Sequence, residues 1–118
     1  MAEAGLFIGW GAVVRGREKK AIEVLGDDQG FWARAQEDGR IESFETVLLD
    51  PHGGDLTGFI LVRGTREQLD EIRNDDELRR RIARGDLLVE RLGVVRATLG
   101  DGLPQLMNEY QELLDEMT

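Results

Sequence analysis

The chain of 118 residues contains four short apolar runs, which are separated by one tight turn and by two longer helical patterns. The runs cover residues 6–14, 41–49, 57–63 and about 87–99, and glycines or turn sequences bound them. Asp50-Pro51-His52-Gly53-Gly54-Asp55 separates the second run from the third and is a strong turn signal. This order constrains the fold most, because a short turn joins antiparallel neighbours whereas a helical connection can cross over the sheet.

Two helical patterns lie between the strand-like runs. Residues 17–38 carry apolar side chains at helical spacing but include Gly26 and Gly30, so we expect a break or kink in the helix near Gly26-Asp27-Asp28-Gln29-Gly30. The second pattern opens at Thr65, and Thr65 to Gln68 has the spacing of a capping box. A change in the phase of the apolar residues predicts that another helix starts near Asn74 or Asp75.

The last helical pattern covers residues 103–117 and has one continuous apolar stripe. The stripe consists of Leu103, Leu106, Met107, Tyr110, Leu113, Leu114 and Met117. Pro104 falls in the first turn, where the missing amide hydrogen costs little. We expect this helix to pack across subunits or over an open sheet edge.

The order of elements is therefore β-α-β-β-α-β followed by a helix, within one domain that spans residues 1–118. Right-handed crossovers convert this order into a four-stranded antiparallel sheet with helices on one face. The prediction is an α+β protein with the ferredoxin-like arrangement plus a C-terminal helix.

The face of the sheet that lies away from the helices is predicted to be mixed instead of polar. If the hairpin pairs symmetrically, Val47 lies opposite Phe59 and Ser43 opposite Arg63, and these residues share that face. The full set expected there is Phe7, Val13, Val47, Leu49, Phe59, Leu61 and Val94, beside Glu45, Arg63 and Arg96. A contiguous apolar patch marks an interface or a ligand groove, so we expect a homodimer formed by sheet-on-sheet packing.

Composition excludes several classes of protein. Apolar residues make up 41% of the chain and charged residues 33%, which is a globular composition. The chain has no cysteine, so disulfides and thiolate metal sites are ruled out. The net charge of −9 disfavours nucleic-acid binding, and the arginines between residues 79 and 84 read as a solvated helix face. No signal peptide or membrane-spanning run is visible, and the expected location is the cytoplasm.

The residues that could carry chemistry are few. Ser43 and His52 are the only serine and histidine, and about 20 Å of strand would separate them, too far for a catalytic dyad. One histidine with Asp50 and Asp55 is a weak basis for a metal site, and no metal or other cofactor is predicted. Glycines at 9, 11 and 16 do not have the spacing of the dinucleotide-binding fingerprint.

Charged residues on a covered apolar face should be paired or should hold a polar ligand group. Glu45 and Arg96 are such residues, and two interpretations stay open: a salt bridge between subunits, or a base and an anion clamp. The predicted ligand-pocket residues are Glu45, Arg96, Phe59, Arg63 and His52.

The element order, with the phrases Glu37-Asp38-Gly39-Arg40-Ile41 and Gly93-Val94-Val95-Arg96 and the hairpin turn, resembles the dimeric α+β barrel superfamily. Within it the chain is most similar to the YCII-related group of small bacterial proteins. The resemblance implies two ferredoxin-like sheets that pack face to face around a cavity. A histidine near the first helix, characteristic of the YCII-related group, is absent here.

Three functions follow as hypotheses. The first is binding of a mainly apolar small molecule in the cavity between the sheets of a dimer. The second is a non-catalytic interaction or sensor module whose cavity is merely core. The third, implied only by the resemblance, is a monooxygenase or isomerase that works without a cofactor.

Overall fold

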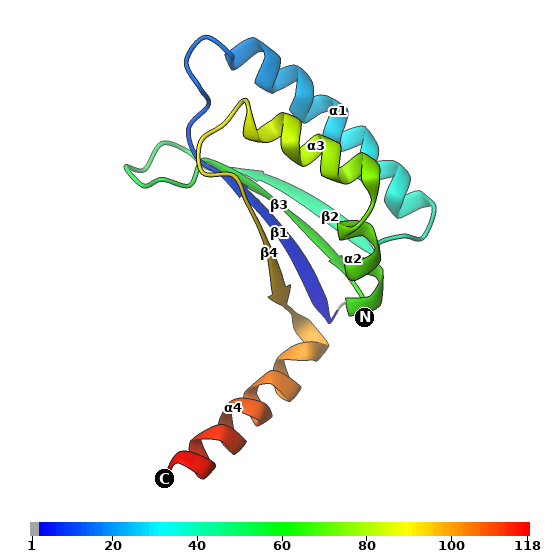
Figure 1. Cartoon of the computed structure of the whole chain (residues 1–118), viewed down its shortest axis with the longest axis vertical. Helices are drawn as coiled ribbons and strands as arrows, with labels where there is room; N and C mark the ends of the chain where they lie inside the picture. The colour runs from blue at the N-terminus through cyan, green and yellow to red at the C-terminus, as the bar shows by residue number, and fades with distance from the viewer. Residues whose placement is uncertain (1–2) are drawn as a thin grey trace.

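The computed structural model describes residues 3–118 and contains one antiparallel sheet of four strands. The strands are β1 (Ala4–Trp10), β2 (Ser43–Leu48), β3 (Gly58–Gly64) and β4 (Gly93–Thr98), in the spatial order β2-β3-β1-β4. The helices are α1 (Glu18–Glu37), α2 (Arg66–Arg73), α3 (Asp76–Asp86) and α4 (Leu103–Met117). The first three helices cover one face of the sheet (Figure 1), which confirms the ferredoxin-like arrangement.

The hairpin of β2 and β3 has the predicted register. Ser43 pairs with Arg63 and Val47 with Phe59, and the amide of Leu49 donates to the carbonyl of Thr57 at 2.9 Å. Alternation along the strands then places Phe44, Thr46, Ile60 and Val62 on the helix side. The turn sequence between the strands therefore fixed both the pairing and the two faces of the hairpin.

The predicted faces of β4 are wrong by one residue. Val94 pairs with Ile8 and Arg96 pairs with Leu6, and residues that pair directly point to the same side of a sheet. Val94 and Arg96 therefore lie on the helix face, and Val95 takes the opposite face. Alternation within one strand shows which residues share a face, but the register against β1 decides which face that is.

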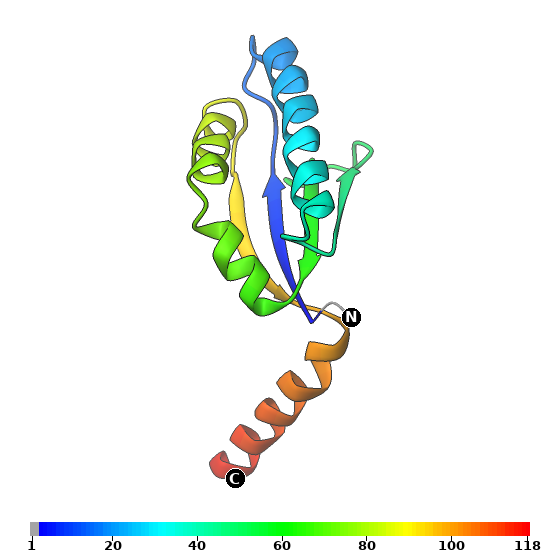
Figure 2. The ribbon, with the colours of Figure 1, turned by 90° about the vertical axis from the view of Figure 1, so that its right-hand side faces the viewer.

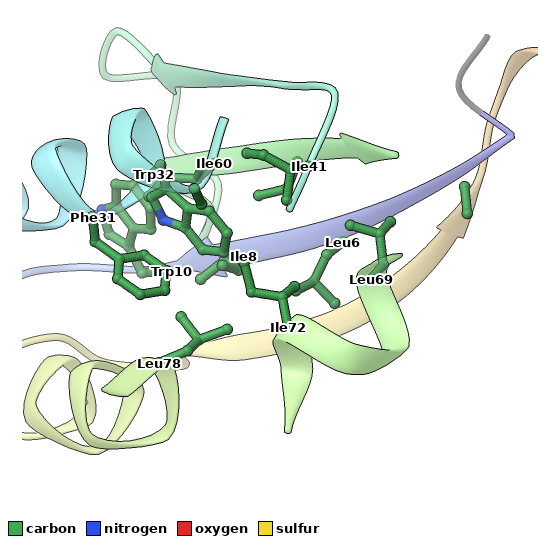
Figure 3. Packing of buried hydrophobic residues seen from close by; sticks show 13 residues of the cluster. Leu6, Ile8, Trp10, Phe31, Trp32, Ile41, Ile60, Leu69, Ile72 and Leu78 are labelled. Carbon is green, nitrogen blue, oxygen red and sulfur yellow. The ribbon is translucent and has the colours of Figure 1, made fainter. Parts of the chain in front are cut away.

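A single hydrophobic core fills the space between the sheet and the helices. Figure 3 shows Trp10 and Ile8 of β1 meeting Phe31 and Trp32 of α1, with Leu78 of α3 beside them. The rings of Phe31 and Trp32 meet edge to face, with centroids 4.9 Å apart. This aromatic cluster joins both helices to the centre of the sheet.

The predicted break in α1 is wrong, because the helix runs without interruption from Glu18 to Glu37. Each glycine in a helix interior costs about 1 kcal/mol relative to alanine. Burial of one large apolar side chain contributes about 1.5–3 kcal/mol, and Phe31 and Trp32 are both almost fully buried. Packing against the sheet therefore outweighs the local preference of Gly26 and Gly30.

Capping groups divide α2 from α3 where the apolar phase changes. Thr65 and Gln68 form the predicted capping box at the start of α2. The Asp75 carboxylate accepts from the amide of Leu78 at 3.0 Å and so caps α3, which starts where the sequence predicted a second helix. Arg40 binds the same carboxylate at 2.7 Å. The hydrogen bond from Arg40 lowers the pKa of Asp75 below its usual value of 3.8.

The C-terminal helix α4 has the predicted bounds, and none of its described residues is buried. Figure 1 and Figure 2 both show it projecting away from the sheet and from the other helices. No helix in the described chain is both long enough and apolar enough to span a bilayer.

Replacing Asp75 by alanine should destabilise the protein by about 1–2 kcal/mol, because α3 loses its N-cap and Arg40 loses its partner. The depressed pKa means that this contribution is present above pH 3.8 and disappears as the pH falls through the lower folded-state value. Urea unfolding at pH 7 measures the effect. The neighbouring exposed change Asp76→Ala is the control, and equal losses in both variants would contradict the capping role.

Candidate functional site

A cavity of about 270 Å³ lies between the sheet, α1 and α3. Its floor is the helix face of the sheet, which Ile8, Trp10 and Ile60 contribute. Its walls come from the two helices and from the segments that lead into and out of them. The described residues that line it are Ile8, Trp10, Val13, Ala21, Ile22, Val24, Leu25, Asp28, Trp32, Leu48, Thr57, Ile60, Leu78, Arg81, Ile82, Gly85, Leu88, Val89 and Leu92.

The cavity opens to solvent between α1 and the end of β2. Ile22 and Leu48 line it and are nevertheless 73% and 62% exposed. Deeper in, Trp32 is almost fully buried and Trp10 is 9% exposed. The cavity therefore has an apolar mouth and an aromatic interior.

Helical spacing brings the lining side chains of α1 and α3 together. Leu25, Asp28 and Trp32 follow one another at intervals of three and four residues on α1. Leu78 and Arg81 repeat the interval of three on α3. Residues at these intervals share one helix face, so each helix presents one polar side chain among apolar neighbours.

Asp28 and Arg81 form the ion pair of the cavity, with 2.8 Å between Arg81 Nη1 and Asp28 Oδ1. Their side chains are only 20% and 16% exposed. Arg81 also donates from Nη2 to Glu77 at 2.9 Å, and its guanidinium lies 5.2 Å from the centre of the Phe31 ring. These contacts hold the cation in one place at the cavity wall.

Burial raises the pKa of Asp28 above the usual 3.8, although the hydrogen bond and the charge of Arg81 act in the opposite direction. Burial alone would lower the pKa of Arg81, but Asp28 and Glu77 raise it overall. The pair therefore offers one permanent cation and one carboxylate whose proton affinity is increased. Such a carboxylate in an apolar cavity is suited to exchange a proton with a bound molecule.

Three of the five predicted pocket residues lie on the sheet face opposite the cavity. Glu45 accepts from Arg63 across the hairpin at 3.3 Å, and both groups are substantially exposed. Phe59 stacks on Phe7, with ring centroids 5.0 Å apart. The predicted mixed character of this face is therefore present at β1, β2 and β3.

The other two predicted residues are separated from that group. Arg96 lies on the helix side of β4 and pairs with Asp70 of α2 at 2.7 Å, so its expected place on the same sheet face as Glu45 is wrong. His52 lies in the hairpin loop, where its ring contacts the carbonyl of Leu56 at 2.8 Å. None of the five lines the cavity.

Sequence reasoning missed Asp28 and Arg81. Arg81 was grouped with its basic neighbours as part of a solvated face, and Asp28 lay in the expected helix break. Their signal was present, because each stands three residues after an apolar residue of its helix face, Leu25 and Leu78. Among the described residues, no group of three or more histidine or carboxylate side chains is placed to hold a metal ion.

Comparison with solved structures supports the fold. A protein from Chloroflexus aurantiacus J-10-fl, provisionally named an antibiotic biosynthesis monooxygenase, superposes with a TM-score of 0.54 at 18% identity. The match covers 84% of this chain and 95% of the other. No known family model matches the chain, and neither does any curated protein. A likeness at this identity shows the shared ferredoxin-like fold.

Replacing Asp28 by asparagine should leave the thermal midpoint at pH 7 unchanged or raise it. The amide removes a charge that burial penalises, yet its oxygen still accepts from Arg81. The pKa of Asp28 is higher in the folded protein than the usual 3.8. The wild type therefore loses stability as the pH rises from 3.8 through the folded-state pKa, and Asp28→Asn should not show this loss.

The control is Asp27→Asn, which alters an exposed carboxylate 4.0 Å from Arg84 and should change stability by no more than about 0.5 kcal/mol. Thermal unfolding monitored by circular dichroism between pH 4 and pH 8 gives the comparison. Strong destabilisation of Asp28→Asn would mean that the ion pair serves only to hold α1 against α3.

Proposed function

We propose that this protein binds a mainly apolar small molecule, with an aromatic ring and one polar group, in the cavity between the sheet, α1 and α3. The observation that carries the proposal is the composition of the cavity wall. Both tryptophans of the chain and a set of aliphatic side chains surround one ion pair. Pockets that bind small molecules have this character, with few polar groups that orient the ligand.

The volume of the cavity sets the size of the ligand. Cavities of about 150 Å³ accommodate benzene, and pockets for larger ligands start near 300 Å³. A volume of about 270 Å³ therefore suits a molecule of two or three fused rings. The exposed Ile22 and Leu48 at the mouth provide an apolar entry.

The ion pair sets the chemistry of the polar group. Arg81 is held by Asp28 and Glu77 and can donate to a carbonyl, a phenolate or a carboxylate. Asp28 can accept a hydrogen bond from a hydroxyl group. A phenol or an aromatic ketone meets both requirements, because it carries one oxygen on a flat apolar body.

Titration with 1-naphthol tests this proposal directly. Trp10 and Trp32 are the only tryptophans in the chain and both line the cavity, so the two indole N–H signals in a ¹⁵N-correlated NMR spectrum report on it. We expect saturable shifts of both signals. The variant Ala21→Phe fills part of the cavity and should weaken binding at least tenfold.

The matched control is Ala33→Phe, which places the same side chain on the exposed side of α1. It should bind 1-naphthol as the wild type does. Absence of indole shifts in the wild type would refute the proposed site, and so would equal binding by both phenylalanine variants.

A second candidate function is oxidation of the bound molecule without a cofactor. Two observations favour it: the raised pKa of Asp28 beside a fixed cation, and the name of the Chloroflexus protein with the same fold. Asp28 would take a proton from an activated methylene group, and Arg81 would stabilise the resulting enolate oxygen. Dioxygen then oxidises the methylene to a carbonyl, R₂CH₂ + O₂ → R₂C=O + H₂O, and no other oxidant is required.

Oxygen uptake with anthrone as the probe tests this second function. We expect uptake that is faster than the spontaneous rate and that falls at least a hundredfold in Asp28→Asn. The same variant should still bind 1-naphthol, which separates loss of chemistry from loss of the site. Uptake that is identical with and without the protein leaves ligand binding as the function.

The sequence-based alternatives remain predictions. An interaction or sensor module would bind no small molecule and would show no response to 1-naphthol. The relation to the YCII-related group gains no support from the site, because no lining residue is a histidine. The homodimer and a second pocket between two sheets require a second copy on the open sheet face, where Phe7 and Phe59 offer an apolar surface.

A further inference from the structure

We propose that α4 of one copy of this protein docks into the groove between α3 and β4 of a second copy. The groove has a volume of about 740 Å³ and reaches the outer strand β4 at Val94. Its apolar floor is formed by Ile82, Leu92 and Val94. The polar residues of its rim are Arg73, Arg79, Asn74 and Asp86, all exposed, so two cations stand against one carboxylate.

The helix α4 has the complementary surface. Its apolar stripe is uncovered, and the exposed fraction rises to 83% at Met117. Residues 103–118 include four acidic residues and no basic one. Helical geometry places Glu109 and Glu116 beside the stripe, on the flank of Leu113. An acidic amphipathic helix thus matches a groove with an apolar floor and an excess of arginine on its rim.

The helix is about as long as the strand that borders the groove. A helix of 15 residues is about 22 Å long, and a strand of six residues is about 20 Å long. A helix laid along β4 also covers the edge of the sheet, which is how many proteins protect a free strand from unwanted pairing.

The helix does not occupy the groove of its own chain. The turn before it is held by a hydrogen bond from the Leu99 amide to the carbonyl of Glu3 at 3.0 Å and by another from Gly102 to Leu99 at 2.8 Å. Gly102 packs so tightly on the backbone of Glu3 that no side chain fits there. Figure 1 and Figure 2 show that the helix consequently leaves the far end of β4, away from α3.

Other occupants and docking sites fit less well. Two copies of α4 packed on each other would bring eight carboxylates together without a cation from either helix. The opposite edge strand, β2, has Glu45 as its charged residue and offers no cation of its own to an acidic helix. A second copy that exchanges α4 reciprocally covers both helices and both grooves in one closed dimer.

The proposed docking groove shares residues with the candidate site. Ile82 and Leu92 line both the groove and the cavity. A helix from the second copy would therefore cover the outer side of one cavity wall. The docking itself does not depend on ligand binding, and its test uses no ligand.

Disulfide trapping tests the contact, because the chain contains no cysteine and each introduced thiol is unique. A copy that carries Met107→Cys on the stripe is mixed with a longer, tagged copy that carries Ala83→Cys beside the groove. After mild oxidation we expect a disulfide between the two different chains on a non-reducing gel. The control Asn108→Cys places the thiol on the polar side of α4 and should be trapped at least tenfold less.

Three results would overturn the proposal. Light scattering could give a mass near 13.3 kDa for the wild type at every concentration, which excludes a second copy. Trapping of Met107→Cys with itself would show helix-on-helix pairing. Preferential trapping with Val95→Cys, on the opposite face of β4, would place α4 on the open sheet face instead of in the groove. Arg79→Glu provides an independent check, since it should shift the dimer toward monomer at low salt.

Discussion

The burial of Phe31 and Trp32 against the sheet is the contact on which the helix layer depends. It keeps α1 continuous across Gly26 and Gly30, and it holds the face that carries Asp28 toward α3. Both helices pack on the sheet, and the cavity lies between them. Trp10 of β1 and Trp32 of α1 line its interior. The cavity is therefore a direct result of how the core is packed.

Burial of the ion pair of Asp28 and Arg81 costs hydration free energy. The hydrogen bond and the attraction between the two groups offset only part of this cost. A buried charged pair is often no more stable than an apolar replacement, because both ions lose hydration. Burial still raises the pKa of Asp28 although Arg81 is only 2.8 Å away. A costly polar pair in an otherwise apolar cavity supports the proposal of a ligand that would use both groups.

Two further apolar surfaces remain uncovered in one copy of the chain. The open sheet face carries stacked phenylalanines, and α4 carries its stripe on a helix directed away from the rest of the molecule. Small soluble domains rarely leave such surfaces in water. Reciprocal docking of α4 accounts for the stripe and the charge of that helix, and it connects assembly to the cavity wall through Ile82 and Leu92.

The sequence by itself determined the order of the elements, the register of the hairpin and the caps at Thr65 and Asp75, because these depend on neighbouring residues. Tertiary structure decided the rest. The face that Arg96 occupies depends on pairing with β1, the continuity of α1 depends on burial of its aromatic residues, and the site depends on two helices that are distant in the chain. Asp28 and Arg81 are 53 positions apart, and local patterns carry no information about a contact that only packing on a common sheet creates.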